Sequence, residues 1–176
     1  MKYYDKGASL SQRLLEGIDT LADNVASTLG PRGRNVILKP KGRNPIVTKD
    51  GVTVAEFIDL DDPIKNAGVQ ILKQASSQTN LVAGDGTTTA TVLARAILKE
   101  SRKYLMAEAS PIELKRGIDK AVTVIVENLK DQSKLVSTID DIEHIATISA
   151  NGDSNIGKLI ATAVDQVGKD GSITVE

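Results

Sequence analysis

Apolar residues recur at intervals of three and four along most of this chain, which is the spacing that places side chains on one face of a helix. The first such helix ends at Gly30-Pro31, and residues 9–12, Ser-Leu-Ser-Gln, match a capping box at its start. A second helix begins at Asp62-Pro63, because aspartate is a good N-cap and proline suits the first helical position. The pattern predicts four more helices, with their apolar stripes over residues 92–105, 114–129, 138–146 and 155–167.

Two short stretches, residues 35–38 and 45–48, have the composition of β-strands instead. The polar turn at residues 39–44 joins them, which predicts a β-hairpin too small to be stable on its own. A third strand-like stretch, residues 171–176, has no nearby partner in the sequence. A lone strand leaves its backbone groups unpaired. We therefore expect that the chain is incomplete or that something else supplies the partner.

The strongest candidate chemistry lies at residues 84–89, which read Gly-Asp-Gly-Thr-Thr-Thr and lead directly into an apolar helical run. Glycines allow a tight turn and a close approach to a ligand. The first turn of the following helix offers free N–H groups and the positive end of the helix dipole to an anion. Asp85 would repel a bare phosphate, so it fits there only beside a cation such as Mg²⁺, which bridges carboxylates and phosphates. The pattern favours a phosphate–metal site.

An ordinary helix cap is the alternative interpretation of this stretch, because a single Asp or Thr before a helix is enough to satisfy its end. Three successive β-branched residues, however, are a poor choice for helix stability. When a sequence departs from helix propensity without a benefit to the structure, as these three residues do, a functional site is the favoured explanation.

Two further polar segments are, taken alone, most simply interpreted as turns. Residues 32–35, Arg-Gly-Arg-Asn, form a basic loop interrupted by glycine. Residues 48–51, Thr-Lys-Asp-Gly, close the second strand, where such a sequence usually turns. The functional alternative for residues 48–51 is a lysine that faces phosphate, next to a carboxylate that orients water or joins a metal shell.

Composition restricts the classes of function. The 176 residues are 40% hydrophobic and 26% charged with a formal net charge of -1, a globular balance without a bulk attraction to nucleic acid or anionic membrane. Aromatic residues make up only 2%, which disfavours stacking on nucleobases. Cysteine is absent, so disulfides and thiolate metal sites are excluded, and a cytoplasmic location fits. No apolar run approaches the length of a membrane span.

One motif is rejected. Residues 152–159 nearly match the phosphate-binding pattern G-x-x-x-x-G-K-[ST], but Leu159 lacks the hydroxyl that would bind Mg²⁺. The second glycine and the lysine also fall inside a predicted amphipathic helix, so we interpret the match as chance. His144 is the only histidine, and without a second histidine or a cysteine it is a poor metal candidate. The polar break at residues 130–134 is the predicted domain boundary.

Taken together, residues 28–35, 48–53 and 83–93 closely resemble group I chaperonins, the large subunits of the bacterial and organellar type. The resemblance covers nearly the whole chain in order and extends to residues 115–122, 148–151 and 167–171. Two departures stand out. Leu81 replaces an acidic residue that is usual in the family, and the opening residues 2–7 differ from the family's first strand, which pairs with a neighbouring subunit's hairpin.

The resemblance implies roles for individual residues. The Gly-Asp-Gly-Thr-Thr-Thr loop would hold the nucleotide phosphates, with Asp85 as the Mg²⁺ ligand, and Asp50 would be the carboxylate that assists hydrolysis. Lys49 matches a lysine near the phosphates. The remaining pocket positions that the resemblance implies are Thr28, Leu29, Gly30, Pro31, Gly86, Thr87, Thr88, Thr89, Ile148 and Ser149.

The family's subunit also has three domains, which the resemblance maps onto this chain in part. The expected fold is mainly α: residues 1–134 form the first half of a helical equatorial domain with a small β-hairpin, which binds ATP. Residues 135–176 form the ascending segment of an α/β hinge domain. We expect the apical domain, the returning hinge segment with the other catalytic aspartate, and the second equatorial half to lie outside this sequence.

Two functional hypotheses follow. The first is a subunit of an ATP-driven folding machine, with ATP and Mg²⁺ as cofactors and K⁺ as a further candidate cation. Its partners would be unfolded client proteins, a co-chaperonin and identical subunits in stacked rings. The alternative is a short, non-catalytic structural or modulatory subunit that docks on complete chaperonin subunits.

Overall fold

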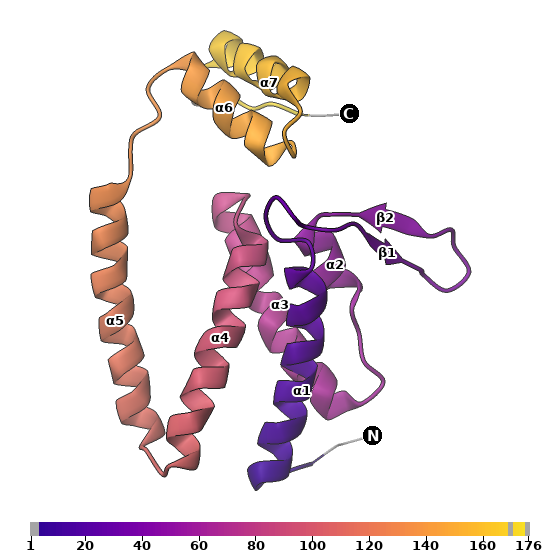
Figure 1. The fold of residues 1–176 in the computed structure, drawn as a ribbon, viewed down its shortest axis with the longest axis vertical. Coiled ribbons are helices and arrows are strands. Elements are labelled where there is room, and N and C mark those ends of the chain that lie inside the picture. Colours follow the sequence, from indigo (N-terminus) through magenta and orange to yellow (C-terminus); the bar gives the residue numbers. More distant parts are fainter. Residues whose placement is uncertain (1–3, 169–170, 175–176) are drawn as a thin grey trace. The chain divides into compact units, whose positions relative to one another are not determined.

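The computed structural model describes residues 4–168 and 171–174, and these residues form seven helices and one two-stranded sheet (Figure 1). The elements in chain order are α1 (Gly7–Ala26), β1 (Val36–Leu38), β2 (Ile46–Thr48), α2 (Gly51–Phe57), α3 (Pro63–Ala83), α4 (Thr87–Met106), α5 (Pro111–Gln132), α6 (Ile139–Ser149) and α7 (Ser154–Val167). The predicted mainly α fold with a small hairpin is confirmed. None of the described helices is both long and apolar enough to cross a membrane.

The chain divides into two compact units, Met1–Arg116 and Gly117–Glu176, and the division falls within α5. Helix α5 itself ends at Gln132, close to the polar break at residues 130–134. The division into an equatorial part, residues 1–134, and a hinge part, residues 135–176, stays a prediction.

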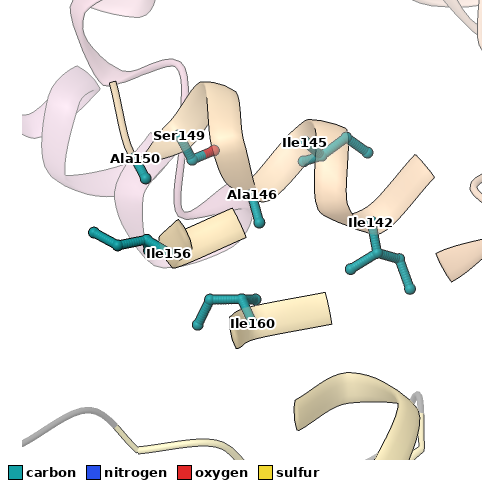
Figure 2. A pocket seen from close by; sticks show the side chains of 7 residues that line it. All are labelled: Ile142, Ile145, Ala146, Ser149, Ala150, Ile156 and Ile160. Atoms are coloured by element: carbon teal, nitrogen blue, oxygen red, sulfur yellow. The ribbon is translucent and has the colours of Figure 1, made fainter. Parts of the chain in front are cut away.

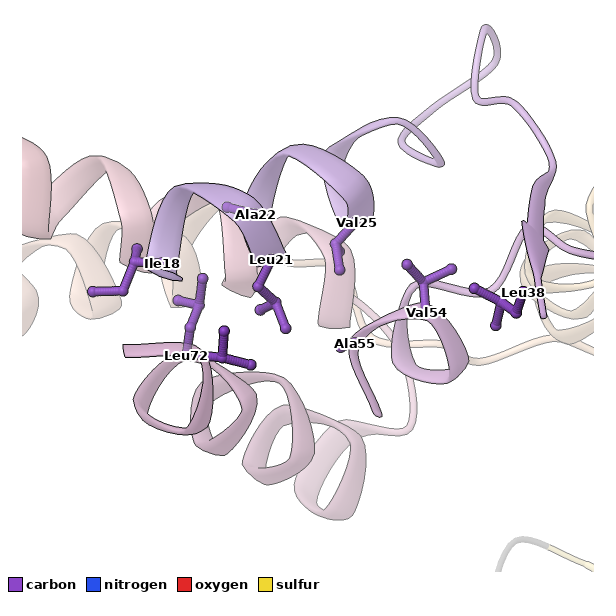
Figure 3. Packing of buried hydrophobic residues seen from close by; sticks show 9 residues of the cluster. Ile18, Leu21, Ala22, Val25, Leu38, Val54, Ala55 and Leu72 are labelled. Carbon is purple, nitrogen blue, oxygen red and sulfur yellow. The ribbon is translucent and has the colours of Figure 1, made fainter. Parts of the chain in front are cut away.

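The first unit has a core in which α1 packs against α2, α3 and α4. The buried positions of α1 recur every three to four residues, which is the helical stripe predicted from the sequence. Figure 3 shows these side chains facing those of α2 and α3. The buried hydrophobic cluster consists of Ile18, Leu21, Ala22, Val25, Leu38, Val54, Ala55, Val69 and Leu72.

Helices α1 and α3 approach each other closely because each carries a glycine at their contact. A Cβ atom on Gly17 would collide with the backbone carbonyl of Lys65, and one on Gly68 would collide with the carbonyl of Leu14. A larger residue at either position would separate the two helices. The apolar pattern of the sequence did not predict this backbone contact.

The hairpin pairs β1 and β2 in antiparallel register, with Val36 opposite Thr48 and Leu38 opposite Ile46. Leu38 is the one strand residue that is buried, and it joins the core beside Val54 of α2 (Figure 3). This contact fixes the position of the hairpin relative to α2. Two residues, Lys49 and Asp50, connect the end of β2 to the first residue of that helix.

The predicted helix start at Asp62-Pro63 is confirmed, and the one at residues 9–12 is wrong. The Asp62 carboxylate accepts hydrogen bonds from the N–H groups of Ile64 and Lys65, with Pro63 at the first helical position. The predicted capping box at residues 9–12 does not form, because α1 already begins at Gly7, two residues earlier, without a side-chain cap. Helix α2 was not predicted at all, since its seven residues are too few to show a helical period.

In the second unit α6 and α7 pack against each other through small residues. Gly157 and Ala161 are the buried residues of α7, and a Cβ on Gly157 would collide with the Thr147 hydroxyl. Gly157 and Lys158 lie inside α7, as expected for a chance match to the phosphate-binding pattern, and His144 is exposed on α6. The predicted strand at residues 171–176 is wrong for residues 171–174, which have no regular structure, and its last two residues lie outside the described range.

Candidate phosphate and metal site

Three segments that are far apart in the sequence meet at one end of the first unit. They are the last turn of α1, the start of α2 and the start of α4 (Figure 1). The contact that joins them is at Gly51, where a Cβ atom would collide with the Thr88 hydroxyl and lie 3.4 Å from Val25 Cγ1. Residues 48–53 and 83–93, both singled out from the sequence, are therefore in direct contact.

The turn between α3 and α4 depends on its two glycines. Gly84 and Gly86 have φ angles of 72° and 80°, a left-handed conformation that is costly for residues with a Cβ atom. Between them, the exposed Asp85 accepts a hydrogen bond from the Gly86 N–H at 2.6 Å. Gly86 occupies the N-cap position of α4 and has no side chain to cap it. The first-turn N–H groups of α4 are therefore left to other acceptors.

The three successive threonines lie in three different environments, because neighbouring residues of a helix point about 100° apart. Thr87 is buried at 7% exposure, Thr88 is half-buried against Gly51, and Thr89 is exposed. Only part of this set can therefore face one ligand through side chains. Their backbone N–H groups, in contrast, all belong to the first turn of the helix and point along its axis.

Asp50 is the N-cap residue of α2, and the geometry around its carboxylate is asymmetric. Its Oδ2 accepts from the Thr53 N–H at 2.9 Å and from the Thr53 hydroxyl at 2.6 Å. Its Oδ1 accepts from the Val52 N–H at 3.4 Å. Partial desolvation raises the pKa of Asp50, but the hydrogen bonds from Thr53 and Val52 outweigh it and hold that pKa below its ordinary value. The carboxylate is therefore ionised at neutral pH.

The turn after α1 is compact and held by its own backbone. The Gly33 N–H donates to the Gly30 carbonyl at 2.9 Å, and the Arg34 N–H donates to the Ser27 carbonyl at 2.8 Å. Thr28 is buried, and its hydroxyl donates to the Val25 carbonyl at 2.7 Å. Thr28 therefore has a structural contact in addition to its predicted role in the pocket.

The other predicted site residues differ in exposure and belong to both units. Leu29, Gly30 and Pro31 are exposed on the same turn, and Lys49 is half-buried between β2 and α2. Ile148 and Ser149 belong to the second unit, at the end of α6. Ile148 is 76% exposed. Ser149 lines an apolar groove of about 610 Å³ between α6 and α7, which Figure 2 shows from close by.

The residues at the α4 end of the first unit fit a magnesium–phosphate group. Among the described residues no cluster of three or more His, Cys, Asp or Glu side chains could hold a metal ion by itself. Magnesium, however, keeps several waters and commonly binds one or two carboxylates together with substrate phosphates. Asp85, beside a helix N-terminus that attracts phosphate, supplies this kind of donor set.

Sequence reasoning missed two residues beside this site. The Thr91 side chain is fully buried and its hydroxyl donates to the Thr87 carbonyl at 2.8 Å, which anchors the first turn of α4. Thr53 contacts Asp50 through both its N–H and its hydroxyl. The signal for Thr53 was its place three residues after an aspartate, a spacing typical of helix starts, but the helix itself had not been predicted.

The structure is that of a mainly helical protein with a glycine-rich turn at the start of a long helix. A family model matches residues 21–176, and by it the chain belongs to the TCP-1/cpn60 chaperonin family. The structure is also similar to one described as the crystal structure of group III chaperonin in the open state, with 24% sequence identity and a TM-score of 0.74.

That structural match covers 90% of this chain but only 32% of the other, so this chain spans about a third of that chaperonin's length. At this identity the likeness establishes the fold. The predicted chaperonin family is confirmed, whereas the narrower group I assignment rests on the sequence motifs and stays a prediction.

Proposed function

We propose that this chain is the nucleotide-binding portion of a group I chaperonin subunit, which binds and hydrolyses Mg-ATP to assist the folding of other proteins. Members of the chaperonin family are ATPases. The observation that carries the proposal is the contact between Gly51 and Thr88, because it holds the residue next to Asp50 against the first turn of α4, where a phosphate would bind.

Each residue then has a chemical role that its position supports. The first-turn N–H groups of α4 would hold the phosphates, and Asp85 would be a ligand of the Mg²⁺ that accompanies them. Lys49, half-buried beside Asp50, offers a positive charge to the phosphates. Asp50 orients the attacking water through its ionised carboxylate. Catalysis of this kind is mostly positioning and neutralisation of charge.

The wider function follows from membership of the family. We propose that the whole subunit assembles with identical subunits in stacked double rings, cooperates with a co-chaperonin and acts on unfolded client proteins in the cytoplasm. Ile148 and Ser149 would complete the nucleotide pocket from the hinge part. K⁺ would be a further cation at the phosphates.

Calorimetric titration of Mg-ATP into the whole subunit that carries this sequence tests the phosphate site. We expect the Asp85→Ala variant to lose Mg-ATP binding. The matched control is Asp153→Ala, because Asp153 caps α7 in the second unit through the N–H groups of Asn155 and Ile156. Equal nucleotide affinity in wild type and Asp85→Ala would contradict the assignment.

The hydrolytic role of Asp50 needs a separate measurement. The Asp50→Ala variant should still bind Mg-ATP but hydrolyse it at least about a hundredfold more slowly, in the range typical of lost acid–base or water-positioning groups. Steady-state turnover, measured at saturating nucleotide, gives the comparison. An unaltered rate in this variant would refute the role of Asp50.

A further inference from the structure

Thr53 makes the shortest hydrogen bond to the Asp50 carboxylate. Its hydroxyl donates to Oδ2 at 2.6 Å, a distance typical of a charge-assisted bond between a hydroxyl and an ionised carboxylate. Its backbone N–H donates to the same oxygen at 2.9 Å. Oδ2 therefore has two strong donors, both of them from Thr53.

Capping of α2 does not require this hydroxyl. The N-cap function of Asp50 consists of accepting the N–H groups of Val52 and Thr53, and both bonds come from the backbone. In a capping box the third helical residue carries a side chain that accepts a bond from the N-cap backbone. Here the third helical residue is Thr53, and it donates to the N-cap side chain instead. Helix capping therefore does not account for the hydrogen bond from the Thr53 hydroxyl to Asp50.

The hydrogen bonds from Thr53 determine which oxygen of the Asp50 carboxylate can accept a further hydrogen bond. Oδ2 is occupied by the two bonds from Thr53, whereas Oδ1 has one long bond of 3.4 Å to the Val52 N–H. The acceptor capacity of Asp50 is thus left mainly on Oδ1. Asp50 is exposed, and the next residue, Gly51, packs against Thr88 at the start of α4.

We propose that Thr53 is a positioning residue for nucleotide hydrolysis: its hydroxyl holds the Asp50 carboxylate so that Oδ1 accepts a hydrogen bond from the attacking water. This inference rests on the proposed function, because it assigns a supporting residue to the same site. A carboxylate with two strong donors is a weak base, so Asp50 acts by orienting the water.

Two variants separate the hydroxyl from the shape of the side chain. Thr53→Val keeps the β-branched form and removes the donor, and Thr53→Ser keeps the donor and removes a methyl group. In the whole subunit we expect Thr53→Val to lower kcat for ATP hydrolysis roughly tenfold, the effect of losing one hydrogen bond to a charged group. KM should stay within about twofold of wild type. Thr53→Ser should keep kcat within about threefold of wild type.

The pH dependence of kcat gives a further test, because a purely structural role of Thr53 would not change it. Removing a donor to the ionised form raises the pKa of a carboxyl group. The acidic limb of the kcat profile should therefore move to higher pH in Thr53→Val and stay in place in Thr53→Ser. Carbon-detected NMR titration of the Asp50 carboxyl group in this chain should show the same two results.

The outcomes distinguish this inference from the proposed function. A wild-type subunit that neither binds nor hydrolyses Mg-ATP would overturn the proposed function, and the role of Thr53 with it. Normal wild-type turnover with an unchanged kcat in Thr53→Val would overturn only the role of Thr53. An equal loss of kcat in Thr53→Val and Thr53→Ser would do the same, because it would show that packing and not the hydroxyl matters.

Discussion

The two units of this chain differ in how much of their apolar surface they bury. In the first unit, α1, α2 and α3 share a core whose members Leu21, Val25, Val54 and Val69 have no exposed surface. In the described part of the second unit, α6 has no buried residue and α7 buries only Gly157 and Ala161. Large apolar side chains there stay open, among them Ile145 at 50% and Ile156 at 46% exposure.

The denser packing of the first unit makes it the better place for a site whose residues must be held in fixed positions. Asp50, Gly51 and the turn at residues 84–89 are attached to helices that share one core, so their mutual positions are fixed by packing. Ile148 and Ser149 sit on a helix pair that leaves an apolar groove open. Burial of apolar area is the main source of stability. The first unit should therefore be the more stable of the two.

The largest expected effect comes from shortening one apolar side chain in each unit. Leu21→Ala should destabilise the first unit by about 3 kcal/mol, because it leaves a cavity at a position with no exposed surface. Ile160→Ala removes a half-buried side chain that lines the groove in the second unit, and it should cost less than about 1.5 kcal/mol. Urea unfolding followed by circular dichroism measures both. Equal effects would contradict the comparison.

A second test uses glycines with the same helical conformation but different surroundings. Gly68→Ala should destabilise the first unit by about 2 kcal/mol, because the new Cβ would meet the Leu14 carbonyl and push α1 and α3 apart. Gly117→Ala is the matched control. Gly117 lies in α5 with nothing within 4 Å of the new Cβ, so this change should stabilise the helix by about 0.5–1 kcal/mol. The free energies of unfolding come from the same urea titrations.

Acid should weaken the first unit, in which three carboxyl groups have a lowered pKa because each has a basic partner. Hydrogen bonds from Arg13 lower the pKa of Asp62 and of Asp5, and a hydrogen bond from Lys65 lowers the pKa of Glu16. A carboxyl group with a lowered folded-state pKa contributes stability above its unfolded value, about 4, and loses that contribution as the pH falls through the folded pKa. We expect the urea concentration at the unfolding midpoint of the first unit to decrease as the pH is lowered below about 4.

The Asp62→Asn variant is the control for this pH effect. It removes the charge that pairs with Arg13 at 2.7 Å and keeps a side-chain oxygen that can cap α3. Its stability at pH 7 should be lower than that of wild type, and it should depend less on pH between about 5 and 2. An identical pH dependence in variant and wild type would show that the Asp62–Arg13 pair does not contribute.

The smallest expected effect concerns a polar atom in the first unit's core. Ser76 on α3 is 1% exposed, and its hydroxyl has no hydrogen-bond partner among the described residues. Ser76→Ala should therefore leave the free energy of unfolding unchanged or raise it by up to about 1 kcal/mol. A clear loss of stability would mean that the hydroxyl has a partner, such as an ordered water molecule.

The features that the sequence predicted well are those with a local cause. The long helices follow from their apolar stripes, the start of α3 from Asp62-Pro63, and the turn at Gly84 and Gly86 from residues that accept a positive φ. The features that it did not predict depend on distant residues. Helix α2 is too short for a period of its own, and the contact of Gly51 with Thr88 joins segments 37 positions apart.

Hydrogen exchange followed by mass spectrometry, with the whole subunit in the presence and absence of Mg-ATP, tests whether the starts of α2 and α4 form one nucleotide site. We predict that nucleotide slows exchange at residues 84–93 and at residues 48–53 together, and that Asp85→Ala abolishes both effects. Protection of neither segment, or of residues 84–93 alone, would contradict the claim that the starts of α2 and α4 form one nucleotide site.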